Sequence, residues 1–169
     1  NTLPAIAWAV ARIARQAPDA LIGVFSSDHG GADTAAFLNA WQAAETAADA
    51  GYIALFGMQP TEPATGFGYI EAGAPLELGA GTTVVRQVAR FVEKQDLATA
   101  EGFLNHGSYY WNGGMFVFRA DRFMAMLEKH QPALFAVLPQ LAAGDKLASA
   151  DLYRQLPEIS IDYGLLECA

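Results

Sequence analysis

The stretch SYYWNGGMFVFRADRF, residues 108–123, decides the fold class because it joins a buried strand to a helix start. Met115 to Phe118 form a continuous apolar run, which is typical of a strand covered on both faces. Asp121 is then predicted to cap a helix that ends before Pro132. Residues 111–114, WNGG, precede the strand. Two explanations stay open for them: a tight turn, or a pocket that a ligand approaches closely.

Strands and helices alternate on the amino-terminal side of this stretch. Residues 20–25 form a short apolar strand, residues 34–48 have the apolar spacing of a helix, and residues 52–58 form the next strand. Gly51 is predicted to end the helix. Strand–helix–strand order with short connections indicates a parallel βαβ unit. The sequence therefore predicts an α/β fold with an open, mostly parallel sheet and helices on both faces.

The other elements are assigned from caps and apolar periodicity. Residues 5–15 are expected to be helical after a cap at Asn1 or Thr2, and residues 82–94 are expected to form a long strand. Asp96 is predicted to cap a helix over residues 97–105. Helical pieces follow to residue 155, and a last helix is expected to start near Asp162.

Composition excludes several classes of function. The chain has 169 residues, a net charge of −8 and one cysteine, with 53% hydrophobic and 17% charged residues. Acidic charge and scattered basic residues disfavour nucleic-acid binding. No apolar run is long enough to span a membrane. A single cysteine suits a reducing cytoplasm, and scarce cations make a divalent metal the expected partner of an anionic ligand.

Carboxylates at two strand ends are candidates for a ligand site. Asp28 follows the strand 20–25 and could hold Mg²⁺ through oxygen, although a turn or helix cap is an equally simple role. Glu93 and Lys94 end the long strand. A carboxylate can accept hydrogen bonds from vicinal sugar hydroxyls and an ammonium can bind phosphate; the alternative is an exposed ion pair.

Three further positions have both a structural and a functional explanation. Gly68 closes a glycine-rich turn, which is either a hairpin turn or a place where backbone N–H groups meet a ligand. Asn112 needs a hydrogen-bond partner if buried, and either a sugar hydroxyl or a backbone group would serve. Asp162 is either a helix N-cap or a second carboxylate of a metal site with Asp28.

Several motifs together resemble mannose-1-phosphate guanylyltransferase, a family of sugar-1-phosphate nucleotidyltransferases with a Rossmann-like α/β fold. They are SSDH, QPTEPATGFGYIEAG, FVEK, WNGGMFVFRADRF and ISIDYGLLE, in that order over residues 1–169. The resemblance implies that the chain is the central and C-terminal part of one catalytic domain. It lacks the family's upstream glycine-rich nucleotide loop. The fold is therefore expected to be incomplete at the N-terminus and the chain alone to be inactive.

The resemblance also implies a reaction and a set of roles. GMP would pass from GTP to mannose 1-phosphate, with Mg²⁺ neutralising charge, and GDP-mannose and pyrophosphate would form. Asp28 and Asp162 would bind the metal, Lys94 the sugar phosphate, Glu93 and Asn112 the sugar hydroxyls, Gly68 the sugar through its N–H, and Asn1 and Thr2 the nucleotide. Asp28, Lys94 and Asp162 would be the catalytic residues. The protein is expected to be cytoplasmic, and a homodimer is left open.

Departures from the family pattern leave two alternatives. Phe67 stands where the family has Tyr, and Gln95 replaces a Pro, which is expected to relax the turn that aims Lys94. One alternative is a non-catalytic sugar-phosphate-binding or regulatory module. The other is a nucleotidyltransferase for a different hexose 1-phosphate or nucleotide, although the motifs WNGGMF and ISIDY favour mannose.

Overall fold

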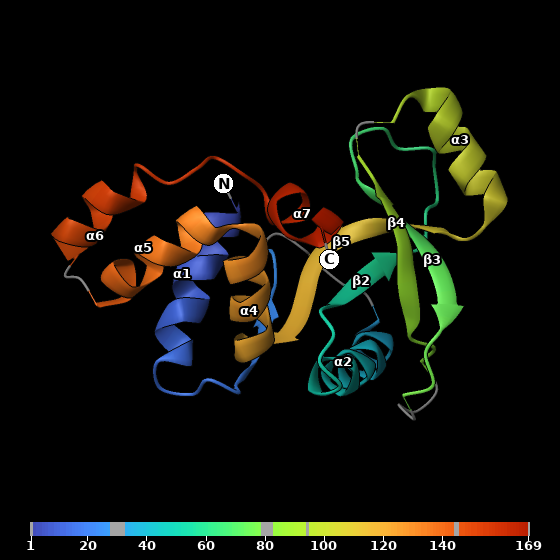
Figure 1. Cartoon of the computed structure of the whole chain (residues 1–169). Coiled ribbons are helices and arrows are strands. Elements are labelled where there is room, and N and C mark those ends of the chain that lie inside the picture. Colours follow the sequence, from blue (N-terminus) through green and yellow to red (C-terminus); the bar gives the residue numbers. More distant parts are fainter. Residues whose placement is uncertain (1, 28–32, 79–82, 94, 144–145, 169) are drawn as a thin grey trace. The chain divides into compact units, whose positions relative to one another are not determined.

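The computed structural model describes residues 2–27, 33–78, 83–93, 95–143 and 146–168, the side chains of 146–149 excepted. The chain forms two compact units (Figure 1). The first unit consists of Asn1–Ile22 and Phe118–Ala169, and the second unit is the continuous segment Gly23–Val117. The expected α/β fold with helices on both sides of a sheet is confirmed, and the solved structures compared below support it.

The sheet has five strands, and its direction differs from the sequence prediction. The strands are β1 (Leu21–Val24), β2 (Ala54–Met58), β3 (Tyr69–Pro75), β4 (Arg86–Val92) and β5 (Tyr109–Arg119). Their order is β1-β5-β3-β4, and β2 also pairs with β5. The described pairings β2–β5, β3–β5 and β3–β4 are antiparallel, so the mostly parallel sheet was wrong.

The reason for the antiparallel pairing lies in the connections. The described residues between β3 and β4 contain no helix, and a chain that returns without a crossover pairs antiparallel. The strands at 21–24 and 54–58 do belong to a strand–helix–strand segment, but each pairs with β5. The predicted parallel βαβ pair is therefore not formed between them.

Strand β5 is longer than the apolar run that predicted it. It includes the WNGG residues, which are strand rather than turn. Leu55 of β2 pairs with Phe116, but Gly57 pairs with Asn112, so Phe56 opposes three residues of β5. A Cβ on Gly113 would come within 2.8 Å of the Phe56 carbonyl oxygen, and Gly114 has a φ of +62°. The bulge itself therefore requires both glycines.

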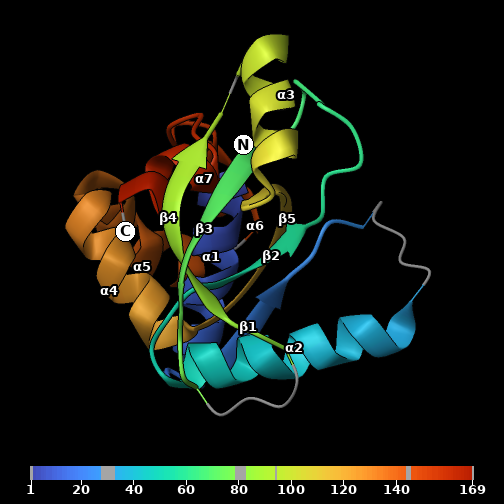
Figure 2. The same ribbon diagram turned by 90° about the vertical axis from the view of Figure 1, so that its right-hand side faces the viewer.

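Two helices of the second unit pack on its strands (Figure 2). Helix α2 (Thr34–Asp49) buries Ala44 and Ala48 against residues of β2 and β5, namely Phe56, Met115 and Val117. Helix α3 (Leu97–His106) buries Ala100 and Phe103 against Tyr69 and Tyr109. The predicted Asp96 cap is confirmed, because its carboxylate accepts a hydrogen bond from the Thr99 N–H at 2.8 Å. Gly51, with φ +94°, follows the end of α2 as expected.

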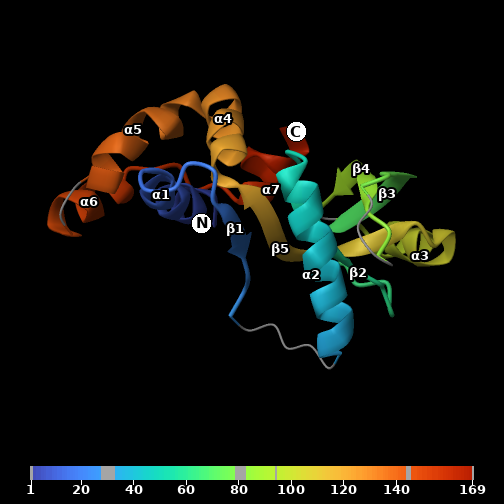
Figure 3. The ribbon, with the colours of Figure 1, turned by 90° about the horizontal axis from the view of Figure 1, so that it is seen from below.

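Helices form most of the first unit. They are α1 (Thr2–Ala14), α4 (Ala120–His130), α5 (Pro132–Ala143), α6 (Lys146–Tyr153) and α7 (Ile161–Gly164), followed by the 3₁₀ turn η1 (Leu166–Cys168). Helix α1 packs against α4 and α5 (Figure 3). The Trp8 Nε1–H donates to the Leu141 carbonyl at 2.9 Å. None of the described helices is long and apolar enough to cross a membrane.

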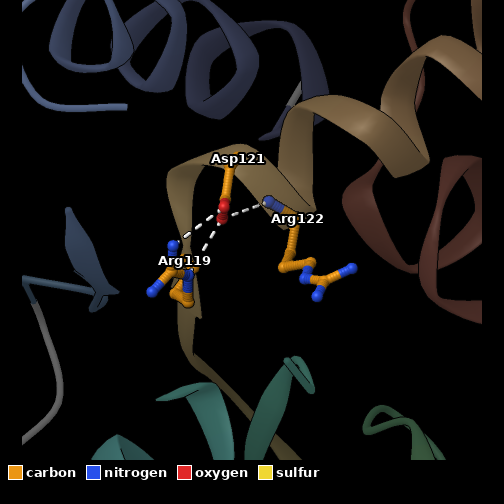
Figure 4. A network of polar contacts seen from close by, with 3 residues as sticks. All are labelled: Arg119, Asp121 and Arg122. Atoms are coloured by element: carbon orange, nitrogen blue, oxygen red, sulfur yellow. Dashed lines mark hydrogen bonds and ion pairs between the residues drawn. The ribbon is translucent and has the colours of Figure 1, made fainter. Parts of the chain in front are cut away.

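The predicted cap at Asp121 was wrong by two positions. Helix α4 begins at Ala120, with Arg119 as the N-cap residue, so Asp121 lies in the first turn. Its carboxylate accepts hydrogen bonds from the Arg119 guanidinium at 2.9 and 3.1 Å and from the Arg122 N–H at 2.8 Å (Figure 4). These bonds hold the pKa of Asp121 below its ordinary value, and the bond from Arg119 contributes most. An acidic side chain there also complements the helix dipole.

Candidate sugar-phosphate site

Three predicted site residues lie in one row across the sheet. Tyr69 pairs with Val92 on one side and with Trp111 on the other. One position further along the three chain segments, Gly68 therefore lies between Glu93 and Asn112. Gly57 continues the row, because it is the register partner of Asn112. The structure thus brings Gly68, Glu93 and Asn112 together, which sequence spacing alone could not do.

Glu93 covers Gly68. A Cβ built on Gly68 would overlap the Glu93 Oε1 atom and lie 2.8 Å from its Cδ. The carboxyl group therefore occupies the volume that a side chain at position 68 would fill. The glycine allows this placement, and any larger residue would displace the carboxylate.

Asn112 is held by the backbone on two sides. Its N–H donates to the Gly68 carbonyl at 2.8 Å, and its Oδ1 accepts the Gly114 N–H at 3.1 Å. Its neighbours in the row, Gly57 and Gly68, have no side chains. The Asn112 amide therefore stands between two side-chain-free positions. The volume that a side chain would fill is taken by Glu93 at Gly68 and by Tyr110 at Gly57.

Gln95 fixes the loop before Gly68. It is buried, with 8% of its surface exposed. Its Nε2 donates to the carbonyls of Ala64 at 3.1 Å and of Phe67 at 2.9 Å. These bonds tie residues 64–67 to the junction of β4 and α3. No signal in the sequence identified this link, because its two ends lie 28 and 31 positions apart. Lys94 lies outside the described residues, so the predicted relaxation of the turn that aims it stays a prediction.

Aromatic side chains surround this loop. The rings of Phe67 and Trp111 meet edge to face with centroids 5.2 Å apart, and Phe67 is half exposed. Among the described residues, three buried polar atoms have no hydrogen-bond partner: Tyr69 Oη, Gln95 Oε1 and Trp111 Nε1. Such atoms are costly to leave unpaired.

Thr2 and Asp162 lie close together in the first unit. The Thr2 Oγ1 accepts the Ile161 N–H at 2.9 Å, and the Leu3 N–H donates to the Ile159 carbonyl at 3.2 Å. Asp162 follows in the first turn of α7. The N-cap of that helix is Ser160, whose Oγ accepts the Tyr163 N–H at 3.3 Å. The role of N-cap for Asp162 is therefore excluded.

The remaining predicted residues, Asp28, Lys94 and Asn1, lie outside the described residues. Their roles and the pairing of Asp28 with Asp162 stay predictions. Within the described ranges, no group of three His, Cys, Asp or Glu side chains is arranged to hold a metal ion.

The row can recognise hydroxyl groups. A carboxylate accepts two hydrogen bonds, and a primary amide both donates and accepts. The chain is therefore an α/β protein whose sheet carries a row of residues with two polar side chains, Glu93 and Asn112. Such side chains can form hydrogen bonds with a small polyhydroxylated ligand.

The comparisons with known proteins give the family. The family model described as nucleotidyl transferase matches residues 1–155. The chain therefore belongs to the nucleotidyl transferase family.

Individual relatives agree with this assignment. The xanthan biosynthesis protein XanB of Xanthomonas campestris is 45% identical over 99% of the chain, and the mannose-1-phosphate guanylyltransferase ManC of Salmonella typhimurium is 41% identical over 99%. The chain spans about a third, 36%, of each relative. A crystal structure titled mannose-1-phosphate geranyltransferase, from Thermus thermophilus, matches with a TM-score of 0.82 and 34% identity, over 99% of the chain and 47% of that protein. This similarity to a solved structure confirms the expected α/β fold.

Proposed function

We propose that the full-length protein transfers GMP from GTP to mannose 1-phosphate and releases GDP-mannose and pyrophosphate. The observation that carries the proposal is the row of Glu93, Gly68 and Asn112, in a chain that belongs to the nucleotidyl transferase family. Relatives named mannose-1-phosphate guanylyltransferase, such as ManC, support the choice of substrates.

The chemistry needs no strong base. A phosphate oxygen of mannose 1-phosphate attacks the α-phosphorus of GTP, and a new P–O bond forms. The bond between the α-phosphorus and the bridging oxygen breaks, and pyrophosphate leaves with that electron pair. Because the nucleophile is already an anion, catalysis consists of positioning and charge neutralisation.

The residues of the row hold the sugar in this proposal. The Glu93 carboxylate accepts hydrogen bonds from two vicinal hydroxyls of mannose, and Asn112 binds a third hydroxyl. The Gly68 N–H donates to the sugar. Lys94, next to Glu93 in the chain, would bind the sugar phosphate, and Asn1 and Thr2 would lie at the nucleotide. Each of these assignments is an expectation from the family resemblance.

Mg²⁺ is the proposed cofactor, and Asp28 and Asp162 are its proposed protein ligands. Carboxylate oxygens fit this cation, which takes few protein ligands when phosphates supply the rest. Asp162 is partly buried. When bound, the ion would neutralise charge on the triphosphate.

Pyrophosphate release tests the proposal. The full-length protein is assayed with GTP, UTP and dTTP, each with mannose 1-phosphate and with glucose 1-phosphate, in Mg²⁺ and in excess chelator. We expect release with GTP and mannose 1-phosphate in Mg²⁺ at a rate well above every other combination. Preference for another pair would assign a different nucleotidyltransferase, and binding without release would favour the non-catalytic module.

Three expectations accompany the proposal. They are a cytoplasmic location, inactivity of the 169-residue chain by itself, and a homodimer as one open oligomeric state. Each stays a prediction.

A further inference from the structure

We infer that Gln95 is a positioning residue that holds the loop of residues 64–67, and through it Gly68, in the geometry that receives the hexose phosphate. The inference rests on the proposed function for its ligand. Gln95 itself is not expected to touch the sugar. Its role is to connect two segments that each lead into the row.

The connection is specific to an amide. Both partners of Gln95 Nε2 are carbonyl oxygens, of Ala64 and Phe67. Carbonyls only accept, so the group facing them must be the –NH₂ and not the amide oxygen. A glutamate of the same shape would place a carboxylate oxygen against two carbonyls. An apolar side chain of similar length would leave both carbonyls without this donor.

Burial makes these hydrogen bonds effective. Water competes poorly for a side chain that is 8% exposed, so the two bonds hold the loop against solvent. The Oε1 of the same amide has no partner within the described part of the chain. The side chain is therefore held at this position by its two donated bonds.

The two hydrogen bonds that Gln95 donates, here called the latch, connect segments that lead to Gly68, Asn112 and Glu93. Phe67, whose carbonyl it holds, is the residue before Gly68, and the Phe67 ring packs on Trp111, the residue before Asn112. On the other side, Gln95 is two residues after Glu93. A loop that moves without the latch would shift Gly68 relative to Glu93 and Asn112. The expected effect is on sugar binding, because neither partner of the latch is an expected nucleotide contact.

The variants are Gln95→Met and Gln95→Glu in the full-length protein. The matched control is Gln155→Met: Gln155 also donates from Nε2 to a backbone carbonyl, that of Asp151 at 3.2 Å, but it is exposed and lies in the first unit. We expect the Michaelis constant for mannose 1-phosphate to rise at least about tenfold in both Gln95 variants. The constant for GTP should change less than about twofold, and Gln155→Met should leave both constants unchanged.

Hydrogen exchange provides a readout that needs no ligand. In the free protein, the amides of residues 65–68 should exchange at least about tenfold faster in Gln95→Met than in the wild type, while the melting temperature falls by only a few degrees. If Gln95→Glu does not fold, Gln95→Met still tests the positioning role of Gln95. Equal rises in both Michaelis constants would mean that Gln95 only supports the fold, and would overturn the inference.

The two failures are distinguishable. A wild-type protein that neither binds mannose 1-phosphate nor releases pyrophosphate would sink the proposed function. The exchange rates would then decide whether Gln95 is a latch at all. A wild-type protein that is active, with Gln95 variants that keep its Michaelis constants and loop exchange, would overturn the latch and leave the proposed function standing.

Discussion

The Asn112 N–H donates a hydrogen bond to the Gly68 carbonyl across 2.8 Å, one step beyond the pairing of Trp111 with Tyr69. This bond continues the β3–β5 ladder into the glycine-rich loop. It fixes Gly68 at the level of Asn112, and Glu93 reaches the same level from β4. The register of the sheet therefore brings the three residues to one level.

The first prediction concerns Gly68→Ala. The new Cβ would take the place of the Glu93 carboxyl group, which lies at the end of a flexible side chain and can move away. We expect a folded protein whose Michaelis constant for mannose 1-phosphate is at least about tenfold higher, because Glu93 is displaced. Gly66→Ala is the control, since a Cβ there meets nothing within 4 Å. Equal effects of the two changes would remove the special role of Gly68.

The second prediction separates two functions of Asn112. Its Oδ1 accepts the Gly114 N–H, and Asp can accept that bond equally well, whereas Ala cannot. We expect Asn112→Asp to lose sugar affinity, since it lacks the –NH₂ donor. Asn112→Ala should also lower the free energy of unfolding by about 1 kcal/mol. Calorimetry measures the affinity for mannose 1-phosphate, and urea unfolding measures the free energy of unfolding. Full affinity in Asn112→Asp would exclude the role of the Asn112 –NH₂ as a donor to the sugar.

Local elements could be predicted from the sequence, but the pairing of strands could not. Asp96 as a cap and Gly51 as a helix end depend on neighbours within a few residues, and both are confirmed. The antiparallel sheet depends on which distant strands meet β5. The polar and glycine residues at 111–114 also broke the apolar pattern, which hid the first half of that strand.

The same distinction holds for the site. Glu93, Gly68 and Asn112 were selected through resemblance, and the register places them in one row. The link from Gln95 to Ala64 and Phe67 was not predicted, because these partners lie 31 and 28 positions earlier in the chain. Long-range backbone contacts of this kind leave no periodic signal in the sequence. Asp28, Lys94 and Asn1 stay predictions.

The third prediction is a pH dependence from Asp121. Hydrogen bonds from Arg119 lower the pKa of this carboxyl in the folded protein. A lowered pKa means that the stabilisation is present above the unfolded value, near pH 4, and is lost as the pH falls through the folded value. We expect Asp121→Asn to be less stable than the wild type at pH 6, with the difference vanishing toward pH 2. Urea unfolding across this range measures it, and a difference independent of pH would contradict the assignment.

The fourth prediction tests Thr2. Its hydroxyl oxygen accepts the Ile161 N–H, so Thr2→Val, of nearly the same shape, leaves that N–H without this acceptor. We expect a loss of about 1 kcal/mol in the free energy of unfolding, and recovery in Thr2→Ser. Thr46→Val is the control, because the Thr46 hydroxyl only donates to the Gln42 carbonyl within α2. Should Thr2→Val be as stable as the wild type and yet bind GTP poorly, Thr2 would be a nucleotide contact alone.

The last prediction concerns Asp162, the one proposed metal ligand among the described residues. It lies in the first turn of α7, and Ser160, not Asp162, caps that helix. If its carboxylate helps to hold Mg²⁺, the amide should cut kcat at least about 100-fold, because transition-state charge is neutralised less well. Raising the Mg²⁺ concentration should restore part of the rate. Asp151→Asn is the matched control, since Asp151 is an exposed carboxylate paired with Arg154 on the same unit. Near-normal kcat in Asp162→Asn at ordinary Mg²⁺ would leave Asp162 without a catalytic role and would require other ligands for the metal.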